Sequence, residues 1–217
     1  MSTALTAIFD VPIKREAVWG LAWPEEERLE TDSGLGGNRQ YVDLRDCDWE
    51  DYAEAAACEA DLISRLEGLE DDDARSELIE AWESYGDPDV DIFALMGLDI
   101  GVASVVLALS ASGCAPCTSC NGGAFGDGHH ESHPLVLFFS RQSLAPLLLE
   151  CAEEIDVGLV GVEGGLMVYS RTIGGMQAFG AALHRRRDEI HAINIRSRPC
   201  GEGDDDVDDD QLDLFED

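Results

Sequence analysis

The stretch from residue 113 to residue 134 constrains the fold most, because it is rich in side chains that bind metals and poor in side chains that form a core. Five glycines lie within it, so some interaction must offset the entropic cost of ordering this loop. Thiolate and imidazole are the ligands that zinc prefers, and the stretch therefore predicts a metal-tied loop between two regular elements. The candidate ligands are three cysteines and three histidines: Cys114, Cys117, Cys120, His129, His130 and His133.

Six candidate ligands compete for the four places around a zinc ion, and the spacing leaves more than one set open. Three cysteines with one histidine form one possible set. Cys117, Cys120, His129 and His133 form another, because their C-x2-C and H-x3-H spacings resemble the half-sites of zinc fingers. The span between the two pairs is shorter than in the usual finger, so we assign no finger family.

The same stretch allows other kinds of chemistry. An iron–sulfur cluster would need a fourth thiolate, either Cys151 or Cys200, and would leave the histidines unused. A catalytic zinc site would keep an open position and use Glu131 or Asp127 as acid or base, although a structural site is the interpretation we favour. Cys120 could also act as a nucleophile with the histidine nine residues later, but the nucleophile motif of papain-like proteases is absent. Finally, the stretch could be a surface loop whose cysteines only pack.

The charge of the chain limits the classes of function. It has 46 acidic and 14 basic side chains and a net charge of −32, which repels nucleic acid and anionic membranes. We therefore expect no direct nucleic-acid binding over most of the surface. The sequence does not start like a signal peptide, and no apolar run approaches the roughly 18 residues of a membrane span. A cytoplasmic location is expected, where clustered cysteines indicate a metal or chemistry rather than disulfides.

Hydrophobic periodicity predicts a helix-rich α+β fold in a single domain. In the acidic first half of the chain, helices are expected at residues 49–69 and 71–85, with Asp48 as the N-cap of the first. In the second half, helices are expected at 99–111, 142–154 and 173–193, and Asp99 should cap the first of them. Strands are expected at 135–139, 157–162 and 166–170. The last two strands should form a hairpin within a small antiparallel sheet of two or three strands.

These patterns divide the chain into three regions. Residues 1–47 are irregular and are expected to pack on the body through apolar side chains around Trp19 and Trp23. Residues 48–196 form the α+β domain with the Cys/His loop. Residues 197–217 are predicted to be a disordered acidic tail, because the part from residue 201 onward holds ten acidic side chains, no basic one and few apolar ones.

One group of basic side chains interrupts the acidic pattern near the end of the last predicted helix; it consists of Arg185, Arg186, Arg187, Arg196 and Arg198. It could hold a phosphate or nucleic acid. It could equally complement the dipole at the C-terminus of a helix, or bind the acidic tail of the same chain. His184 and His191 are two turns apart on this helix and are expected to be surface or core side chains rather than ligands.

The predicted tail contains one short motif, Gln211-Leu212-Asp213-Leu214-Phe215. It resembles the pentapeptide by which bacterial replication and repair proteins dock on the DNA polymerase sliding clamp (the β clamp), and all five positions match the preferred form. The resemblance implies that Gln211 hydrogen-bonds in one subsite while Leu214 and Phe215 fill a hydrophobic pocket. It concerns these five residues and implies nothing about the folded domain.

Taken with the charge and the Cys/His stretch, the motif predicts a small acidic zinc-binding accessory protein that is recruited to the bacterial sliding clamp in replication, repair or phage–host conflict. One alternative is a metal-dependent hydrolase that uses the Cys/His loop. Another is an acidic DNA mimic that occupies a nucleic-acid-binding protein and spaces its carboxylates like phosphates along one face.

Overall fold

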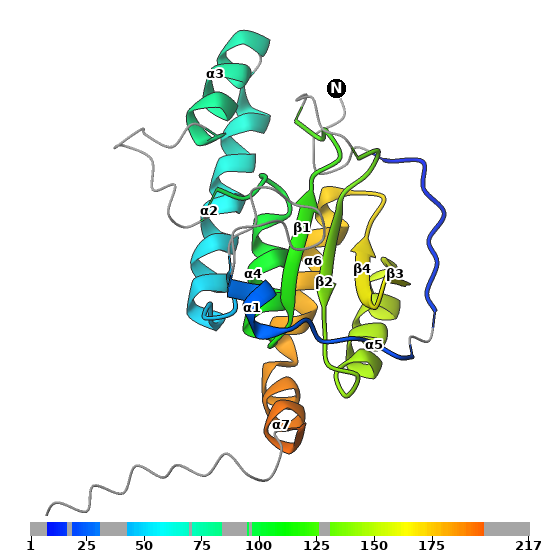
Figure 1. Ribbon diagram of the computed structural model, residues 1–217. Coiled ribbons are helices and arrows are strands. Elements are labelled where there is room, and N and C mark those ends of the chain that lie inside the picture. The colour runs from blue at the N-terminus through cyan, green and yellow to red at the C-terminus, as the bar shows by residue number, and fades with distance from the viewer. Residues whose placement is uncertain are drawn as a thin grey trace, which may run out of the picture.

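The computed structural model describes residues 8–16, 19–30, 43–69, 71–83, 95, 97–125 and 131–197. Within these residues the fold is α+β, as predicted, with seven helices and a four-stranded antiparallel sheet (Figure 1). In chain order the elements are α1 (Glu26–Glu30), α2 (Trp49–Gly68), α3 (Asp72–Glu83), α4 (Ala103–Ala111), β1 (Ala115–Cys120), β2 (Leu135–Phe139), α5 (Ala145–Ile155), β3 (Gly158–Val162), β4 (Gly165–Tyr169), α6 (Ile173–Arg185) and α7 (Arg187–Ser197).

The sheet has the strand order β1-β2-β4-β3, and every neighbouring pair is antiparallel. Strand β2 has the predicted bounds, and β3 and β4 form the predicted hairpin. The expectation of two or three strands was wrong, because part of the stretch predicted as a metal-tied loop is strand β1. This strand pairs with β2 in a register that shifts between Pro116 and Thr118.

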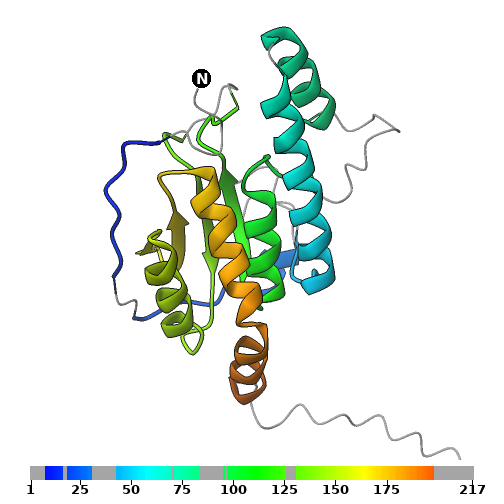
Figure 2. The same ribbon diagram turned by 180° about the vertical axis from the view of Figure 1, so that it is seen from behind.

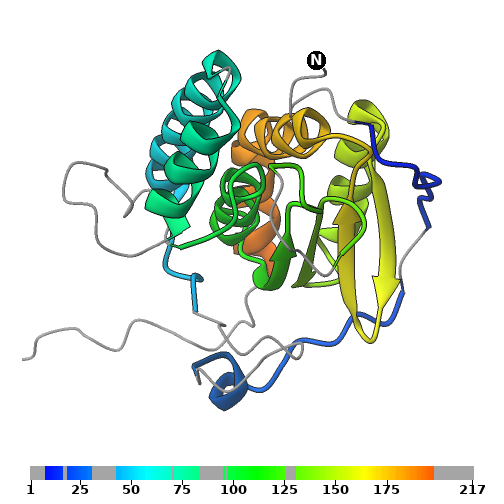
Figure 3. The same cartoon turned by 90° about the horizontal axis from the view of Figure 1, so that it is seen from above.

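All the described helices except α1 lie on one side of the sheet (Figure 3). Helix α2 packs against α4, α4 against α6, and α6 against α5. The sheet residues that face these helices are at most 1 % exposed: Val136, Phe138, Leu159, Leu166 and Val168. Their alternation with less buried neighbours is the period of two expected of strands. Helix α4 lies at the centre and is buried from Ala103 to Ser110, as its apolar composition predicts.

Local side-chain caps mark the starts of α2 and α6. Helix α2 starts where predicted: the Asp48 carboxylate accepts hydrogen bonds from the N–H groups of Glu50 and Asp51, and the Asp51 carboxylate accepts one from the N–H of Asp48. The predicted start of α4 at Asp99 was wrong. Gly101 adopts φ +95°, outside the helical region, so the N-cap is Val102, three residues later than predicted, and the helix begins at Ala103.

The predicted single helix at 173–193 is two helices, which is a second correction. Arg186 interrupts it with φ −100° and ψ 16°, and α7 continues from the end of α6 as a separate segment (Figure 2). In α7, Ile190 is buried and the Asn194 side-chain amide donates to the Ser112 carbonyl at 3.0 Å. These contacts far along the chain explain why helical periodicity alone did not reveal the break.

The chain before α2 runs along the sheet and contains α1. Arg15 forms a parallel bridge with Leu159 of β3, and the Tyr169 hydroxyl donates to the Pro12 carbonyl at 3.0 Å. Leu29 of α1 is fully buried against the sheet face that points away from the other helices. Trp19, in contrast, is 82 % exposed. None of the described helices combines the length and apolar character needed to cross a membrane.

Candidate functional site

The three cysteines of the predicted metal loop lie on or beside β1 and have different surroundings. Cys114 precedes the strand and is fully buried in the main core. Cys117 lies on the opposite face of the sheet in contact with the Leu29 cluster, and its thiol donates to the Leu137 carbonyl at 3.3 Å. Cys120 ends the strand, and its sulfur accepts a hydrogen bond from the N–H of Gly122 at 3.3 Å.

Strand geometry separates these thiols too far for one metal ion. A strand rises about 3.3 Å per residue, so Cys114 and Cys120 lie roughly 20 Å apart along the chain, and Cys117 lies roughly 10 Å from each. Two thiolates on one zinc ion must lie within about 5 Å of each other, because each Zn–S bond is about 2.3 Å long. Both predicted ligand sets, the one with three cysteines and the one that combines Cys117 and Cys120 with His129 and His133, are therefore incompatible with β1 as a strand.

The environment of the thiols favours their protonated form. Burial raises the pKa of Cys114 to about 12 and the pKa of Cys117 to about 11. Burial also raises the pKa of Cys120, while hydrogen bonds from the backbone of Gly122 and Glu131 act in the opposite direction. A nucleophilic cysteine needs a lowered pKa, and Cys120 lacks this activation in its described surroundings.

His133 lies at the same end of the sheet as Cys120. Cys120 pairs with Leu135 of β2, two residues after His133, and Leu135 pairs with Tyr169 of β4. The His133 ring centroid is 5.4 Å from that of Tyr169. Gly122 lies against the His133 backbone, since a Cβ atom at Gly122 would be 2.6 Å from the His133 carbonyl carbon. The turn after Cys120 and the residues before β2 therefore touch each other.

Burial lowers the pKa of His133, although the Glu131 carboxylate acts to raise it. The Nδ1 atom of His133 lies 3.0 Å from the Ser132 hydroxyl. A lowered pKa favours the neutral imidazole, which is the form that binds metal ions.

Asn121 fixes the turn that follows Cys120. It is 2 % exposed, and its backbone N–H donates to the Asp99 carboxylate at 3.3 Å. Its side-chain amide donates to the Ile100 carbonyl at 3.2 Å and accepts from the N–H of Gly123 at 2.9 Å. Asp99, predicted to cap α4, therefore anchors the end of β1 instead.

The structure thus brings two of the six predicted metal ligands, Cys120 and His133, to one end of the sheet. His129 and His130 lie outside the described residues, as do Asp127, Cys200 and the five residues of the clamp-like motif. Across the described part of the chain, no three histidine, cysteine or acidic side chains come together as a metal-binding group. Cys151, the other candidate for an iron–sulfur cluster, is buried in the core at α5.

The basic group near the end of α6 connects helices. Arg185 pairs with Glu154 of α5 at 2.6 Å. The Arg186 guanidinium pairs with Glu150 of α5 and with Glu189 of α7, each at 2.7 Å. These ion pairs link α5, α6 and α7 to one another.

The two histidines of this region differ in their surroundings. The His184 ring centroid lies 5.0 Å from that of Tyr52 and 5.5 Å from that of Trp49, and His191 is exposed.

Sequence reasoning missed the most extensive buried polar cluster among the described residues, which centres on Glu59 of α2. This side chain is fully buried. Its Oε1 accepts from the N–H groups of Gly101 and Ala103 at 2.7 and 3.0 Å, and its Oε2 accepts from the Ser104 hydroxyl and the Gln177 amide at 2.5 and 3.0 Å. The carboxylate caps α4, which lacks a side-chain cap of its own.

A sequence signal for Glu59 existed. The residue falls at the four-residue spacing of the buried face of α2, between Ala55 and Leu62, so it interrupts an apolar stripe. Burial raises the pKa of Glu59, and the four hydrogen bonds oppose this rise. Because the carboxylate has donors on both oxygens, the arrangement is that of a structural cap.

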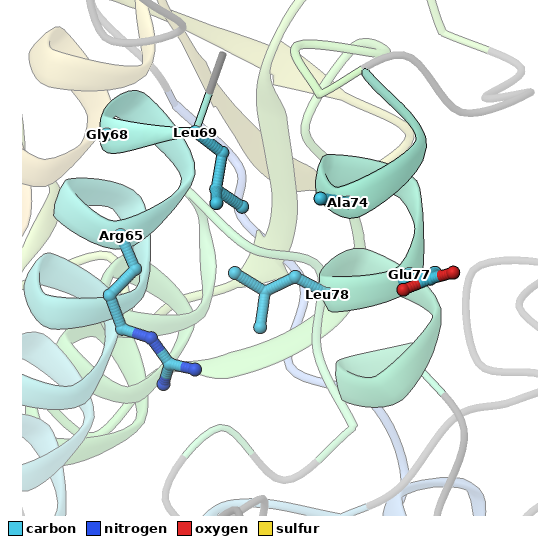
Figure 4. Close-up of a pocket in the computed structure, with 6 residues that line it drawn as sticks. All are labelled: Arg65, Gly68, Leu69, Ala74, Glu77 and Leu78. Atoms are coloured by element: carbon cyan, nitrogen blue, oxygen red, sulfur yellow. The ribbon is translucent and has the colours of Figure 1, made fainter. Parts of the chain in front are cut away.

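A hollow of about 580 Å³ lies between the end of α2 and α3 and is lined by Arg65, Gly68, Leu69, Ala74, Glu77 and Leu78. Figure 4 shows Leu69 and Leu78 pointing into the gap, with the Arg65 guanidinium at its margin. None of the predicted site residues lines it, so it gives no support to any of the functions considered.

Comparison with protein-family models, curated proteins and solved structures gives no significant match to this chain.

Proposed function

We propose that this protein is recruited to the bacterial DNA sliding clamp through residues 211–215 and acts there as an accessory protein of replication, repair or phage–host conflict. The observation that carries the proposal is the sequence Gln-Leu-Asp-Leu-Phe, which matches the clamp-binding pentapeptide at all five positions. The comparisons with family models, curated proteins and solved structures found no match, so they neither support nor oppose this resemblance.

The arrangement of the described body is compatible with such a role. Helix α7 ends at Ser197 on the side of the molecule opposite to α3 (Figures 1 and 2). Residues 198–210 can span up to roughly 45 Å when extended, which would let the motif reach a partner while the domain stays outside the binding pocket. The net charge of −32 would keep the domain away from the DNA that a clamp encircles.

The test measures binding of the full-length protein to a purified bacterial sliding clamp by calorimetry. We expect a dissociation constant near micromolar, because a short peptide segment pays an ordering cost on binding. Leu214→Ala combined with Phe215→Ala should cost about 3–6 kcal/mol from lost apolar burial, a weakening of more than roughly 100-fold. The matched control is Asp208→Ala with Asp209→Ala, which alters the same region without touching the motif and should change affinity mainly through salt-dependent terms.

Two measurements keep this test decisive. The urea stability of both double variants should equal that of the wild type, so that lost binding is not lost folding. If the Leu214/Phe215 variant binds the clamp as tightly as the wild type does, recruitment through this motif is refuted.

A second candidate function concerns zinc, and the specific observation in its favour is that Cys120 and His133 lie at the same end of the sheet, where Gly122 contacts the His133 backbone. We propose that these two residues belong to a structural zinc site whose set is completed by His129 and His130, which precede His133 by four and three residues in the sequence. Zinc would supply the interaction that orders this glycine-rich connection. Cys114, inside the core, would take no part.

The zinc proposal is tested by metal analysis of the purified full-length protein. We expect about one zinc per chain and a lower melting temperature after chelation. Cys120→Ser and His133→Gln should each release the metal, whereas Cys58→Ser, a change at a half-buried cysteine of α2, should retain it. A metal-free wild type that is insensitive to chelation, or a Cys120→Ser variant that keeps its zinc, would contradict the proposal.

A further inference from the structure

We draw no further inference here: the strongest candidate, the half-buried apolar outer face of the sheet around Leu137, Phe139 and Met167, carries nothing, because nothing in the structure shows what covers it beyond the packing of Leu29 of α1 against part of it.

Discussion

Replacing Glu59 tests how the helical layer is held together. The carboxylate belongs to α2, but its four hydrogen-bond donors belong to the start of α4 and to α6. Glu59→Ala removes the acceptor from all of them. The Ser104 hydroxyl can rotate and the partly buried Gln177 amide can turn toward water, whereas the N–H groups of Gly101 and Ala103 are fixed by the backbone.

The expected loss follows from those two fixed donors. Each buried N–H without an acceptor costs about 1–3 kcal/mol, so the two together cost about 2–6 kcal/mol. The substitution also relieves the unfavourable burial of a carboxylate, which is the main cause of the raised pKa of Glu59. We therefore expect Glu59→Ala to lower the free energy of unfolding by about 3 kcal/mol, a large part of the 5–15 kcal/mol typical of a domain.

Glu59→Gln separates the acceptor from the charge. Its carbonyl oxygen can still accept from Gly101 and Ala103, while its amide can donate to the Ser104 hydroxyl once that group rotates. The Gln177 amide, which donates to the same carboxylate oxygen in the wild type, can turn its own oxygen toward the new amide. We expect the loss at neutral pH to be smaller than for Glu59→Ala, within about 1 kcal/mol of the wild type. If the glutamine variant is as unstable as the alanine variant, the charge matters more than the hydrogen bonds.

The comparison with Gln also predicts a pH dependence. Because the pKa of Glu59 is raised above its ordinary value of 4.5 in the folded protein, the folded chain takes up a proton there at a higher pH than the unfolded chain does. The wild type should therefore gain stability relative to Glu59→Gln as the pH falls through the raised pKa toward 4.5. Tyr52, whose pKa is raised by burial and then by Glu59, stays protonated throughout this window.

The assay is urea unfolding followed by circular dichroism at pH 7.5 and pH 5.0 in one fixed salt concentration. Urea is preferable to guanidinium chloride, because guanidinium chloride is a salt and would screen the charges of this chain during unfolding. Glu54→Ala is the matched control, since Glu54 is an exposed acid on the same helix and should change stability by less than about 0.5 kcal/mol. Equal stability of the Glu59→Ala and Glu54→Ala variants would refute the conclusion that the Glu59 carboxylate stabilises the packing of α2 against α4 and α6.

Two further predictions concern charge and backbone conformation. The melting temperature should rise between 10 mM and 1 M sodium chloride, because 46 acidic side chains face 14 basic ones and the Debye length falls from about 30 Å to about 3 Å; a flat curve would mean that the acidic charges are already compensated. Glu163 in the β3–β4 turn has φ 48° and precedes Gly164 at φ +87°, where Asn-Gly is the preferred pair. Glu163→Asn should therefore raise the melting temperature by roughly 1–2 °C and the β-branched Glu163→Val should lower it; the opposite order would contradict the turn assignment.

The elements that sequence reasoning located well are those that local chemistry determines. Asp48 starts α2 because its side chain caps the first turn, and this signal is contained within four residues. The β3–β4 hairpin follows from a two-residue turn that ends in glycine. In both cases the residues that decide the structure are neighbours in the sequence.

The elements that were misplaced depend on contacts far along the chain. The break at Arg186 is stabilised by Glu150 of α5, which is 36 residues away, and nothing in the local period marks it. Asp99 resembles a helix cap in the sequence, yet its carboxylate bonds Asn121 at the end of β1, 22 residues later. Glu59 similarly caps a helix that begins more than forty residues further on. A single sequence gives the residue type for each of these contacts but not the partner.

In the Cys/His stretch, a local spacing predicted the metal-tied loop, but contacts far along the chain determine the structure. The prediction of a loop was therefore wrong for the part that forms β1. Cysteines spaced C-x2-C bind one metal when a tight turn folds them together, as in zinc fingers. Here the same spacing falls on β1, where an extended backbone separates the sulfurs and the alternation of side chains along a strand places Cys117 on the opposite face from Cys114. Only after Cys120 does the chain turn, at Gly122 with φ +70°, and there it meets His133. A metal bound by this stretch through both a cysteine and His133 would therefore lie at that turn. Substitution of Cys120 and His133, rather than of the run of three cysteines, is thus the test of the zinc proposal.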